Sequence, residues 1–247
     1  MAFFQVDYKS AVLGKQTRFT AVIPENAQNA PVVYLLHGLS DSCTSWMRRS
    51  SVERYAEKQG FAVIMPEGER SFYTDMKHGE AFFTAIAEEL PEFVSRMLPV
   101  STEREKNFTA GLSMGGYGAL KMALRFPGKF AAAGIMSAVT DIPGKFADQL
   151  FGQAMWQDIF GSADEAVRDG NDLFTLAEKT AHAPLQPAVI QFCGTEDFLL
   201  EDNRKLNQTL EQLKWPRYIY RETPGTHNWE FWDRHIQDVF EFFSKEI

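Results

Sequence analysis

Residues 109–116, with the sequence TAGLSMGG, contain a serine between two glycines. Gly111, Ser113 and Gly115 match the pattern G-x-S-x-G, in which the serine occupies a sharp turn between a strand and a helix. Small neighbours leave room for such a turn, and the free amides at the start of the helix favour negative charge that develops beside the serine. Ser113 is therefore a candidate nucleophile; the alternative is an ordinary turn serine.

A candidate acid and a candidate base follow two later apolar segments. Asp197 ends the segment QFCGTED, and His227 follows the segment YIYRE after a short loop. A serine hydroxyl is a weak nucleophile unless a histidine accepts its proton and a carboxylate orients that histidine. The order serine, acid, histidine along the chain is one in which such triads occur. We therefore predict a catalytic triad of Ser113, Asp197 and His227, with Glu196 as an alternative acid.

Acyl transfer by a serine also needs hydrogen-bond donors for the negatively charged oxygen of the intermediate. The amide of Met114, which follows the serine, is one predicted donor. The second is expected from the loop after the apolar segment PVVYLLHG, where Leu39 directly follows Gly38. We predict an oxyanion hole formed by the backbone amides of Leu39 and Met114, with Gly38 allowing a close approach of the backbone.

Other residues capable of chemistry have weaker contexts. Asp202 lies near an expected helix start, where an acid commonly caps the helix. His235 lies inside the expected C-terminal helix, and His37 ends an apolar strand, where a structural hydrogen bond is expected. Cys43 lies in a loop that we expect to be exposed and is a minor candidate for thiol chemistry. We therefore assign none of these residues to the triad.

The positions of the acid, the base and the serine depend on the elements around them. Residues 17–25 and the preceding segment alternate like antiparallel strands, and later apolar runs alternate with amphipathic segments. The expected later strands are residues 31–38, 61–68, 106–113, 131–138, 187–197 and 218–225, and the expected helices are residues 51–60, 80–98, 114–130, 203–215 and 228–247. This alternation predicts an α/β fold with a mostly parallel central sheet and helices on both faces.

Residues from about 140 to 187 depart from this alternation, because they are richer in loops and aromatic residues. We interpret them as a small cap-like insertion beside a pocket rather than as a second domain. The predicted organisation is therefore a single domain over residues 1–247. In parallel sheets of this kind, reactive groups collect at the carboxyl ends of the strands, which is where the serine, the acid and the histidine are expected.

The composition is typical of a globular protein, since 45% of the 247 residues are apolar and 23% are charged. The net charge is −8 and no basic cluster is present, so nucleic acids and anionic membranes are not expected partners. No apolar run is long enough to span a membrane, and the N-terminal MAFFQVDYKS lacks the pattern of a signal peptide. We predict a cytoplasmic location and leave a homo-oligomer open.

Cofactor and metal sites are not indicated. The sequence has no glycine-rich phosphate loop and no histidine or cysteine cluster with the spacing of a metal site. Cys43 and Cys193 are far apart and too few for a disulfide framework. We therefore predict that the reaction needs neither a metal nor a cofactor.

Five segments together resemble the esterase D family of α/β-hydrolases, which includes tributyrin-type carboxylesterases, S-formylglutathione hydrolases, and feruloyl and acetylxylan esterases. The segments are HGLSDSCTSW, SFYTDM, GLSMGGYGALKMAL, GTEDFLLEDN and GTHNWEFWD, and the resemblance runs from about Tyr8 to Phe243. It is strongest to the tributyrin-type group. The resemblance implies the α/β-hydrolase fold, assigns the triad roles to Ser113, Asp197 and His227, and assigns the oxyanion roles to Leu39 and Met114.

The resemblance implies a serine carboxylesterase that hydrolyses small-molecule esters with short acyl chains. Feruloyl or acetylxylan esterase, S-formylglutathione hydrolase, acyl transfer to an alcohol, and a non-catalytic binding module are the alternatives. Leu112 and Tyr117 in the serine turn, and His37 before Gly38, differ from the typical S-formylglutathione hydrolase motifs. Several aromatic residues are candidates to line the substrate pocket, with core packing as the alternative: Trp46, Phe72, Tyr73, Trp156, Phe160 and Trp229.

Overall fold

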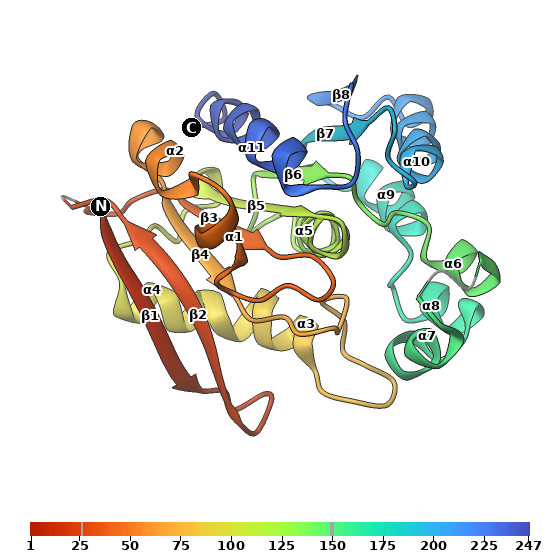
Figure 1. Cartoon of the computed structure of the whole chain (residues 1–247), viewed down its shortest axis with the longest axis horizontal. Coiled ribbons are helices and arrows are strands. Elements are labelled where there is room, and N and C mark those ends of the chain that lie inside the picture. The colour runs from red at the N-terminus through yellow and green to blue at the C-terminus, as the bar shows by residue number, and fades with distance from the viewer. Residues whose placement is uncertain (26, 149–150) are drawn as a thin grey trace.

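Eight strands form one mixed sheet in the order β1-β2-β4-β3-β5-β6-β7-β8 in the computed structural model, which describes residues 1–25, 27–148 and 151–247 (Figure 1). The strands are β1 (Ala2–Lys9), β2 (Gln16–Ile23), β3 (Val32–Leu36), β4 (Ala62–Pro66), β5 (Asn107–Leu112), β6 (Ala132–Met136), β7 (Ala188–Gly194) and β8 (Tyr218–Thr223). The pairs β1–β2 and β2–β4 are antiparallel, and β4, β3, β5, β6, β7 and β8 run parallel. The predicted α/β-hydrolase fold with a mostly parallel sheet is confirmed.

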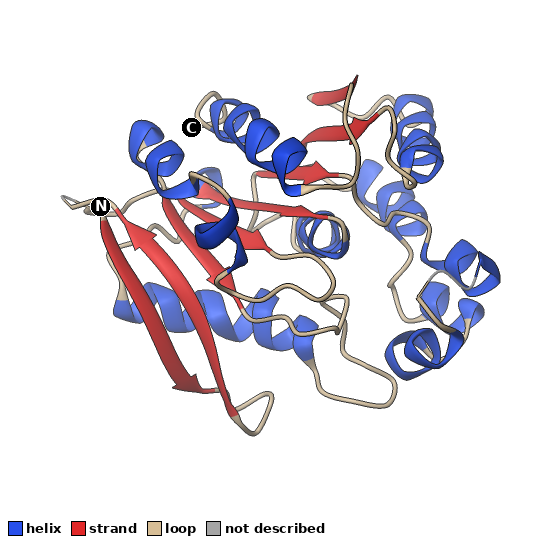
Figure 2. Cartoon of the chain, viewed as in Figure 1, coloured by secondary structure: helices blue, strands red, loops and turns tan. Residues whose placement is uncertain are grey.

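The central strands are buried on both faces, so successive side chains enter two different cores. Tyr34 of β3 packs into one core, whereas Val33 and Leu35 pack into the other. The helices α1 (Ser45–Arg49), α2 (Val52–Gln59) and α11 (Trp229–Phe243) cover one face, and α4 (Leu90–Met97), α5 (Met114–Arg125), α9 (Leu173–Ala181) and α10 (Leu200–Gln212) cover the other (Figure 2). The helices therefore fix the strands from both sides and leave the strand ends to carry loops.

One predicted helix, residues 80–98, is built from three parts. It begins as α3 (Phe82–Thr84), widens into a π-helical segment at Ala85–Glu89, and continues as α4. Pro91 has no N–H group, so it cannot donate to the carbonyl of Ala87 four residues earlier. Lys129 Nζ donates to that carbonyl instead, at 2.8 Å. The proline therefore leaves the helix continuous but changes its local winding.

Residues 140–187 connect β6 to β7, and residues 149–150 of this range lie outside the described residues. The segment contains α6 (Ile142–Asp148), α7 (Gln153–Phe160), α8 (Ala163–Arg168) and α9. Figure 1 shows α6, α7 and α8 together at the right of the molecule, while α9 lies beside α5. Trp156 of α7 packs against Phe72, with ring centroids 4.9 Å apart. Aromatic packing therefore anchors this insertion to the main body.

None of the helices in the described parts of the chain is both long and apolar enough to cross a membrane.

Candidate active site

Ser113 occupies a tight turn between β5 and α5. Its backbone has φ 52° and ψ −118°, a conformation that is strained for a residue other than glycine. The turn is held from both sides: the Ser113 amide donates to the Met136 carbonyl of β6 at 2.9 Å, and the Ser113 carbonyl accepts from the Val139 amide at 3.3 Å. Hydrogen bonds to the neighbouring strand end thus maintain the strained turn that the sequence pattern predicts.

The glycines on either side of the serine are required by space. A Cβ atom on Gly111 would lie 2.3 Å from the carbonyl oxygen of Gly115, and a Cβ atom on Gly115 would lie 2.4 Å from the carbonyl oxygen of Leu36. No side chain fits at these distances, and backbone atoms cannot move aside as a flexible side chain could. The turn at Ser113 therefore closes directly onto the end of β3.

The structure brings Ser113, His227 and Asp197 into one hydrogen-bonded series. His227 Nε2 lies 3.0 Å from Ser113 Oγ, and His227 Nδ1 lies 2.9 Å from Asp197 Oδ2. Asp197 follows β7 and His227 follows β8, so two neighbouring strand ends supply the acid and the histidine. The Asp197 side chain is completely buried, whereas the His227 side chain is 17% exposed. The carboxylate is therefore shielded from water while the imidazole reaches the surface of a cavity.

Asp197 keeps its negative charge despite its burial. Burial by itself raises the pKa of this carboxyl group, but the hydrogen bond and charge of His227, the Leu199 amide at 2.9 Å and the Ser137 hydroxyl together hold the pKa below its usual range. Sequence reasoning missed Ser137, which is fully buried and follows β6 at φ 48°. A short polar residue after an apolar strand was the only signal for it.

Two further aromatic side chains fix the His227 ring. Trp232 meets it edge-on with centroids 4.9 Å apart, and Phe198 packs against it at 4.6 Å. The Trp232 indole N–H donates to Ser137 Oγ at 3.2 Å, so the ring and the carboxylate share one supporting network. Neither aromatic residue was expected from the sequence, although Phe198 directly follows the acid and Trp232 lies in the first turn of the helix after the histidine.

The alternative acids and the alternative base have other partners. Glu196 accepts from the Gly225 amide, at 2.6 Å, and is more exposed than Asp197. Asp202 pairs with Lys145 at 2.8 Å. His235 is buried in α11 with Asp238 2.9 Å away. Burial lowers the pKa of His235, although the Asp238 carboxylate opposes this shift. None of these three residues contacts Ser113 or His227.

A cavity of about 570 Å³ opens over Ser113 and His227. Its lining consists of Gly38, Leu39, Asp41, Arg49, Leu112, Ser113, His227, Asn228, Trp229, Glu230 and Trp232. The described residues of the 140–187 insertion do not line this cavity; Met155, Asp158 and Ile159 line a separate cavity of about 330 Å³. The described residues of the insertion therefore form no part of the wall of the cavity at Ser113.

Of the aromatic residues expected to line the substrate pocket, the structure brings Trp229 to the cavity. The others are core residues, because their rings are needed to fill space under the loops: Trp46, Phe72, Tyr73, Trp156 and Phe160. Trp46 supports the cavity wall indirectly, because it packs behind Trp229. It packs edge-on against Trp229 with centroids 5.1 Å apart, and its indole N–H donates to the Leu36 carbonyl at 3.1 Å.

The two predicted oxyanion donors come from two segments near the serine, the loop after β3 and the start of α5. Met114 is the first residue of α5, where the backbone N–H groups have no acceptor within the helix. Leu39 lines the cavity, and within the described ranges its amide donates to no protein acceptor. A Cβ atom on Gly38 would lie 2.6 Å from Leu112 Cδ1 and 3.7 Å from Ser113 Cβ, so this loop runs against the serine turn.

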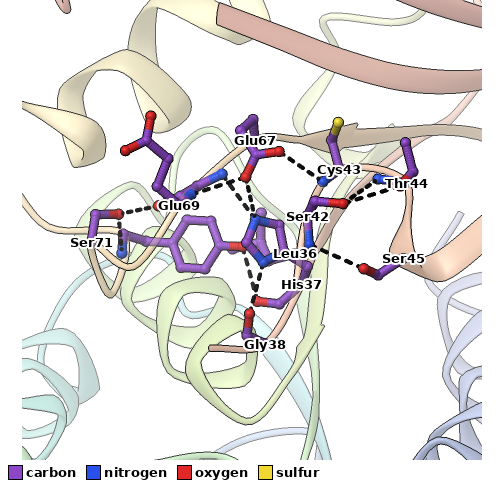
Figure 3. Close-up of polar contacts among 12 residues, drawn as sticks. Leu36, His37, Gly38, Ser42, Cys43, Thr44, Ser45, Glu67, Glu69 and Ser71 are labelled. Atoms are coloured by element: carbon purple, nitrogen blue, oxygen red, sulfur yellow. Dashed lines mark hydrogen bonds and ion pairs between the residues drawn. The ribbon is translucent and has the colours of Figure 1, made fainter. Parts of the chain in front are cut away.

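His37, Cys43 and Glu67 form a polar cluster next to this loop, with His37 and Cys43 buried and the Glu67 side chain 18% exposed (Figure 3). Cys43 is only 2% exposed, which corrects the expectation of an exposed thiol. Burial, together with the nearby Glu67 carboxylate, raises the pKa of the Cys43 thiol to about 12, so this cysteine is protonated and unreactive at neutral pH. Across residues 1–25, 27–148 and 151–247, no group of three or more His, Cys, Asp or Glu side chains is arranged to hold a metal ion.

Comparison with known proteins places this geometry in a family. The model of the Esterase family, described as "Putative esterase", matches residues 10–243. An acetyl esterase from Caldicellulosiruptor saccharolyticus is 30% identical, and the alignment covers 99% of each chain.

Two solved structures from Staphylococcus aureus are similar over 98% of both chains at 32% sequence identity. One is the fluorophosphonate-binding serine hydrolase FphF with substrate bound, with a TM-score of 0.92. The other is the S-formylglutathione hydrolase FrmB, with a TM-score of 0.89. The chain therefore belongs to the Esterase family and is a serine-type carboxylic ester hydrolase with the α/β-hydrolase fold.

Proposed function

We propose that this protein is a carboxylesterase that hydrolyses small esters with short acyl chains through an acyl-enzyme intermediate. Ser113 is the nucleophile, His227 is the general base and acid, and Asp197 orients His227. The observation that carries the proposal is the continuous series from Asp197 through His227 to Ser113 Oγ, which ends in a cavity large enough for a small ester.

The hydrogen bonds of this series determine which atom moves the proton. The buried, ionised Asp197 carboxylate only accepts hydrogen bonds, so His227 Nδ1 carries a proton and Nε2 has a free lone pair. Nε2 takes the proton of Ser113 as Oγ attacks the ester carbonyl, and it then donates this proton to the departing alcohol. A water molecule, activated by the same nitrogen, releases the acid from the serine.

The oxygen that becomes negative in each tetrahedral intermediate binds to the backbone amides of Leu39 and Met114 in this proposal. The support is their position: Leu39 lines the cavity, and Met114 contributes one of the unpaired amides at the start of α5. Each donor of this kind stabilises the transition state by roughly 3 kcal/mol.

The substrate class rests on the similarity to the acetyl esterase and on the cavity. A volume of about 570 Å³ falls within the range of roughly 300–1,000 Å³ typical of small-molecule pockets, so a small ester can enter. Trp229 offers an apolar wall, while Asp41 and Arg49 add charge to the lining. Within the family, we propose that the chain is an esterase D-type enzyme of the tributyrin group.

S-formylglutathione hydrolysis is the second candidate, and the similarity to FrmB favours it. The same serine, histidine and acid would attack a thioester carbonyl. Leu112, Tyr117 and His37 differ from the motifs typical of that activity. We therefore rank it below the carboxylesterase.

A hydrolysis profile on the purified protein tests both candidates. It compares p-nitrophenyl esters from acetate to decanoate, methyl ferulate and S-formylglutathione, with Ser113→Ala as control. Fast turnover of acetate and butyrate that falls with chain length supports the proposal. Dominant turnover of ferulate or of the thioester reassigns the substrate. Equal turnover by Ser113→Ala would overturn the role of the serine.

Other expectations from the sequence stay predictions. We propose a single domain over residues 1–247 with an insertion at about 140–187, because the strands form one sheet. A cytoplasmic location, a homo-oligomer and the absence of nucleic-acid partners still rest on the sequence alone.

A further inference from the structure

A second carboxylate–histidine pair lies next to the serine turn, at the ends of β3 and β4. These parallel strands pair with a constant offset of thirty residues, for example Tyr34 opposite Ile64. Continued past the strand ends, this register brings His37 beside Glu67. His37 Nε2 lies 3.2 Å from Glu67 Oε1 (Figure 3). The Gly68 amide donates to the same ring nitrogen at 3.0 Å. The sheet itself therefore forms this pair.

The other ring nitrogen of His37 contacts the backbone of the predicted oxyanion loop. His37 Nδ1 lies 2.8 Å from the carbonyl oxygen of Gly38. A carbonyl oxygen only accepts hydrogen bonds, so Nδ1 carries a proton and donates it to this contact. That carbonyl belongs to the peptide unit between Gly38 and Leu39. Its opposite end is the Leu39 N–H, the proposed oxyanion donor.

The peptide unit transmits this contact. Because a trans peptide is planar, a hydrogen bond that holds the Gly38 carbonyl also fixes the direction of the Leu39 N–H. A carbonyl that accepts a hydrogen bond also polarises its peptide, which strengthens the N–H as a donor. The Asp41 amide donates to the same carbonyl at 3.2 Å, so the turn holds it from a second side. The direction and the strength of the Leu39 amide therefore depend on His37 Nδ1, the closer of the two donors, together with the Asp41 amide.

Glu67 holds the loop at both ends. One carboxylate oxygen faces His37 at the start of the loop, and the other accepts from the Cys43 amide at its end, at 3.2 Å. The Glu69 amide donates to the first oxygen at 3.1 Å. Burial raises the pKa of Glu67, but the hydrogen bond and charge of His37 and the two amides outweigh this and lower the pKa to about 2. Glu67 is therefore ionised at any working pH.

We infer that Glu67 and His37 are positioning residues that orient and polarise the Leu39 amide for the negatively charged oxygen of the intermediate. This inference rests on the proposed function, in which the Leu39 amide contributes to the oxyanion hole. His37 is 1% exposed, lies outside the cavity lining and acts on the substrate only through the peptide.

The backbone at His37 is fixed by contacts that do not involve its imidazole. The Tyr73 hydroxyl donates to the His37 carbonyl at 3.0 Å, and a Cβ atom on Gly115 would lie 2.6 Å from the same oxygen. Substitution of the imidazole therefore leaves the path of the chain at position 37 supported. Its main effect is expected one peptide further on, at Leu39.

The test is a matched pair of variants, His37→Asn and His37→Gln. The side-chain amide nitrogen of asparagine can occupy the place of Nδ1 and keep the bond to the Gly38 carbonyl. Glutamine extends toward the place of Nε2 and loses that bond. We expect His37→Gln to lower kcat by about tenfold to hundredfold with KM within about threefold, since removal of one oxyanion donor costs roughly 100- to 1,000-fold. His37→Asn should recover most of the loss.

A second readout separates positioning from general destabilisation. A trifluoromethyl ketone forms a tetrahedral adduct with the serine and carries a negatively charged oxygen, whereas the product acid does not. In His37→Gln and Glu67→Gln, affinity for the ketone should fall by the same factor as kcat/KM, while inhibition by the product acid stays within about twofold. Glu67→Gln keeps the shape of the side chain and gives the same test if the His37 variants fail to fold.

Several outcomes overturn the inference. These are equal losses in His37→Asn and His37→Gln, a change in KM rather than kcat, loss of affinity for the product acid, or activity losses that follow the melting temperature. Ser113→Ala in the same assay keeps the two proposals distinct. Full activity in His37→Gln with an inactive Ser113→Ala rejects only this inference, whereas an active Ser113→Ala rejects the proposed function.

Discussion

Two carboxylate–histidine pairs lie on either side of β5: Asp197 with His227 beyond β7 and β8, and Glu67 with His37 beyond β4 and β3. In each pair the acid lies against one ring nitrogen. The other nitrogen of His227, Nε2, meets the Ser113 hydroxyl in a cavity. The other nitrogen of His37, Nδ1, donates to the Gly38 carbonyl in the interior.

This difference explains why the same two residue types perform different tasks. A hydroxyl can give up a proton, so the His227 nitrogen can act as a base. A carbonyl has no proton to give, so His37 can only hold and polarise the peptide. A third pair, His235 with Asp238 on α11, contacts neither the serine nor the loop. The group that the imidazole contacts therefore determines the task of each histidine, and the presence of a carboxylate partner alone does not.

Removal of the nucleophile should have the largest effect on activity of all the substitutions proposed. Ser113→Ala leaves His227 without a hydroxyl to activate, and kcat/KM for p-nitrophenyl acetate should fall by about 10⁴-fold or more. Loss of labelling by a fluorophosphonate, detected as the absence of a mass increase on intact protein, is the independent check. Turnover within about tenfold of the wild type would contradict the assignment.

Neutralising the acid tests the first pair itself. Asp197→Asn keeps the size of the side chain but favours the wrong tautomer of His227, so kcat should fall by about 10³- to 10⁴-fold. Glu196→Gln is the matched control, because its carboxylate binds the Gly225 amide and does not contact His227. Its kcat should stay within about fivefold. A larger loss in Glu196→Gln than in Asp197→Asn would show that the acid is misassigned.

Removing the Ser137 hydroxyl from Asp197 should lower kcat less than removing the Asp197 carboxylate. Ser137→Ala removes a hydroxyl that helps to lower the Asp197 pKa, and a hydrogen bond to a charged group contributes about 1.5–3 kcal/mol. We expect kcat to fall by roughly ten- to hundredfold. Trp232→Phe removes the other hydrogen bond of Ser137 but keeps a ring beside His227, so it serves as control. An unchanged kcat in Ser137→Ala would mean that Asp197 needs no such support.

The second pair, Glu67 with His37, should make the free energy of unfolding depend on pH in the acid range. The Glu67 pKa is lower in the folded protein, about 2, than the 4.5 of the free side chain. Its charge therefore contributes stability that is fully present above about pH 4.5 and is lost as the pH falls toward 2. Urea unfolding at pH 7, 5, 4 and 3 measures this contribution.

Glu67→Gln lacks this ionisation, so its free energy of unfolding should fall less steeply than that of the wild type between pH 4.5 and 3. Between pH 4.5 and 3, the wild type should lose roughly 1–3 kcal/mol more of its free energy of unfolding than Glu67→Gln loses. Parallel curves for the two proteins would mean that Glu67 is not held in its charged form by His37 and the loop amides.

The sequence by itself determined the turn at Ser113, the acid after one apolar run and the histidine after another. These features are local: small neighbours permit the turn, and apolar runs mark strands whose carboxyl ends share one edge of a parallel sheet. The three side chains consequently meet at hydrogen-bonding distance, as expected from the pattern. The order of the elements, and with it the fold class, could be predicted for the same reason.

Only the tertiary structure decided which side chains face the cavity. Trp46 and Trp229 are both near predicted catalytic loops, yet one fills the core and the other lines the wall. Likewise, Glu67 meets His37 because β3 and β4 are neighbours in the sheet, and Ser137 reaches Asp197 from a third strand end. Burial and strand neighbours are properties of the assembled sheet, since they depend on residues distant in sequence, and no local pattern carries them.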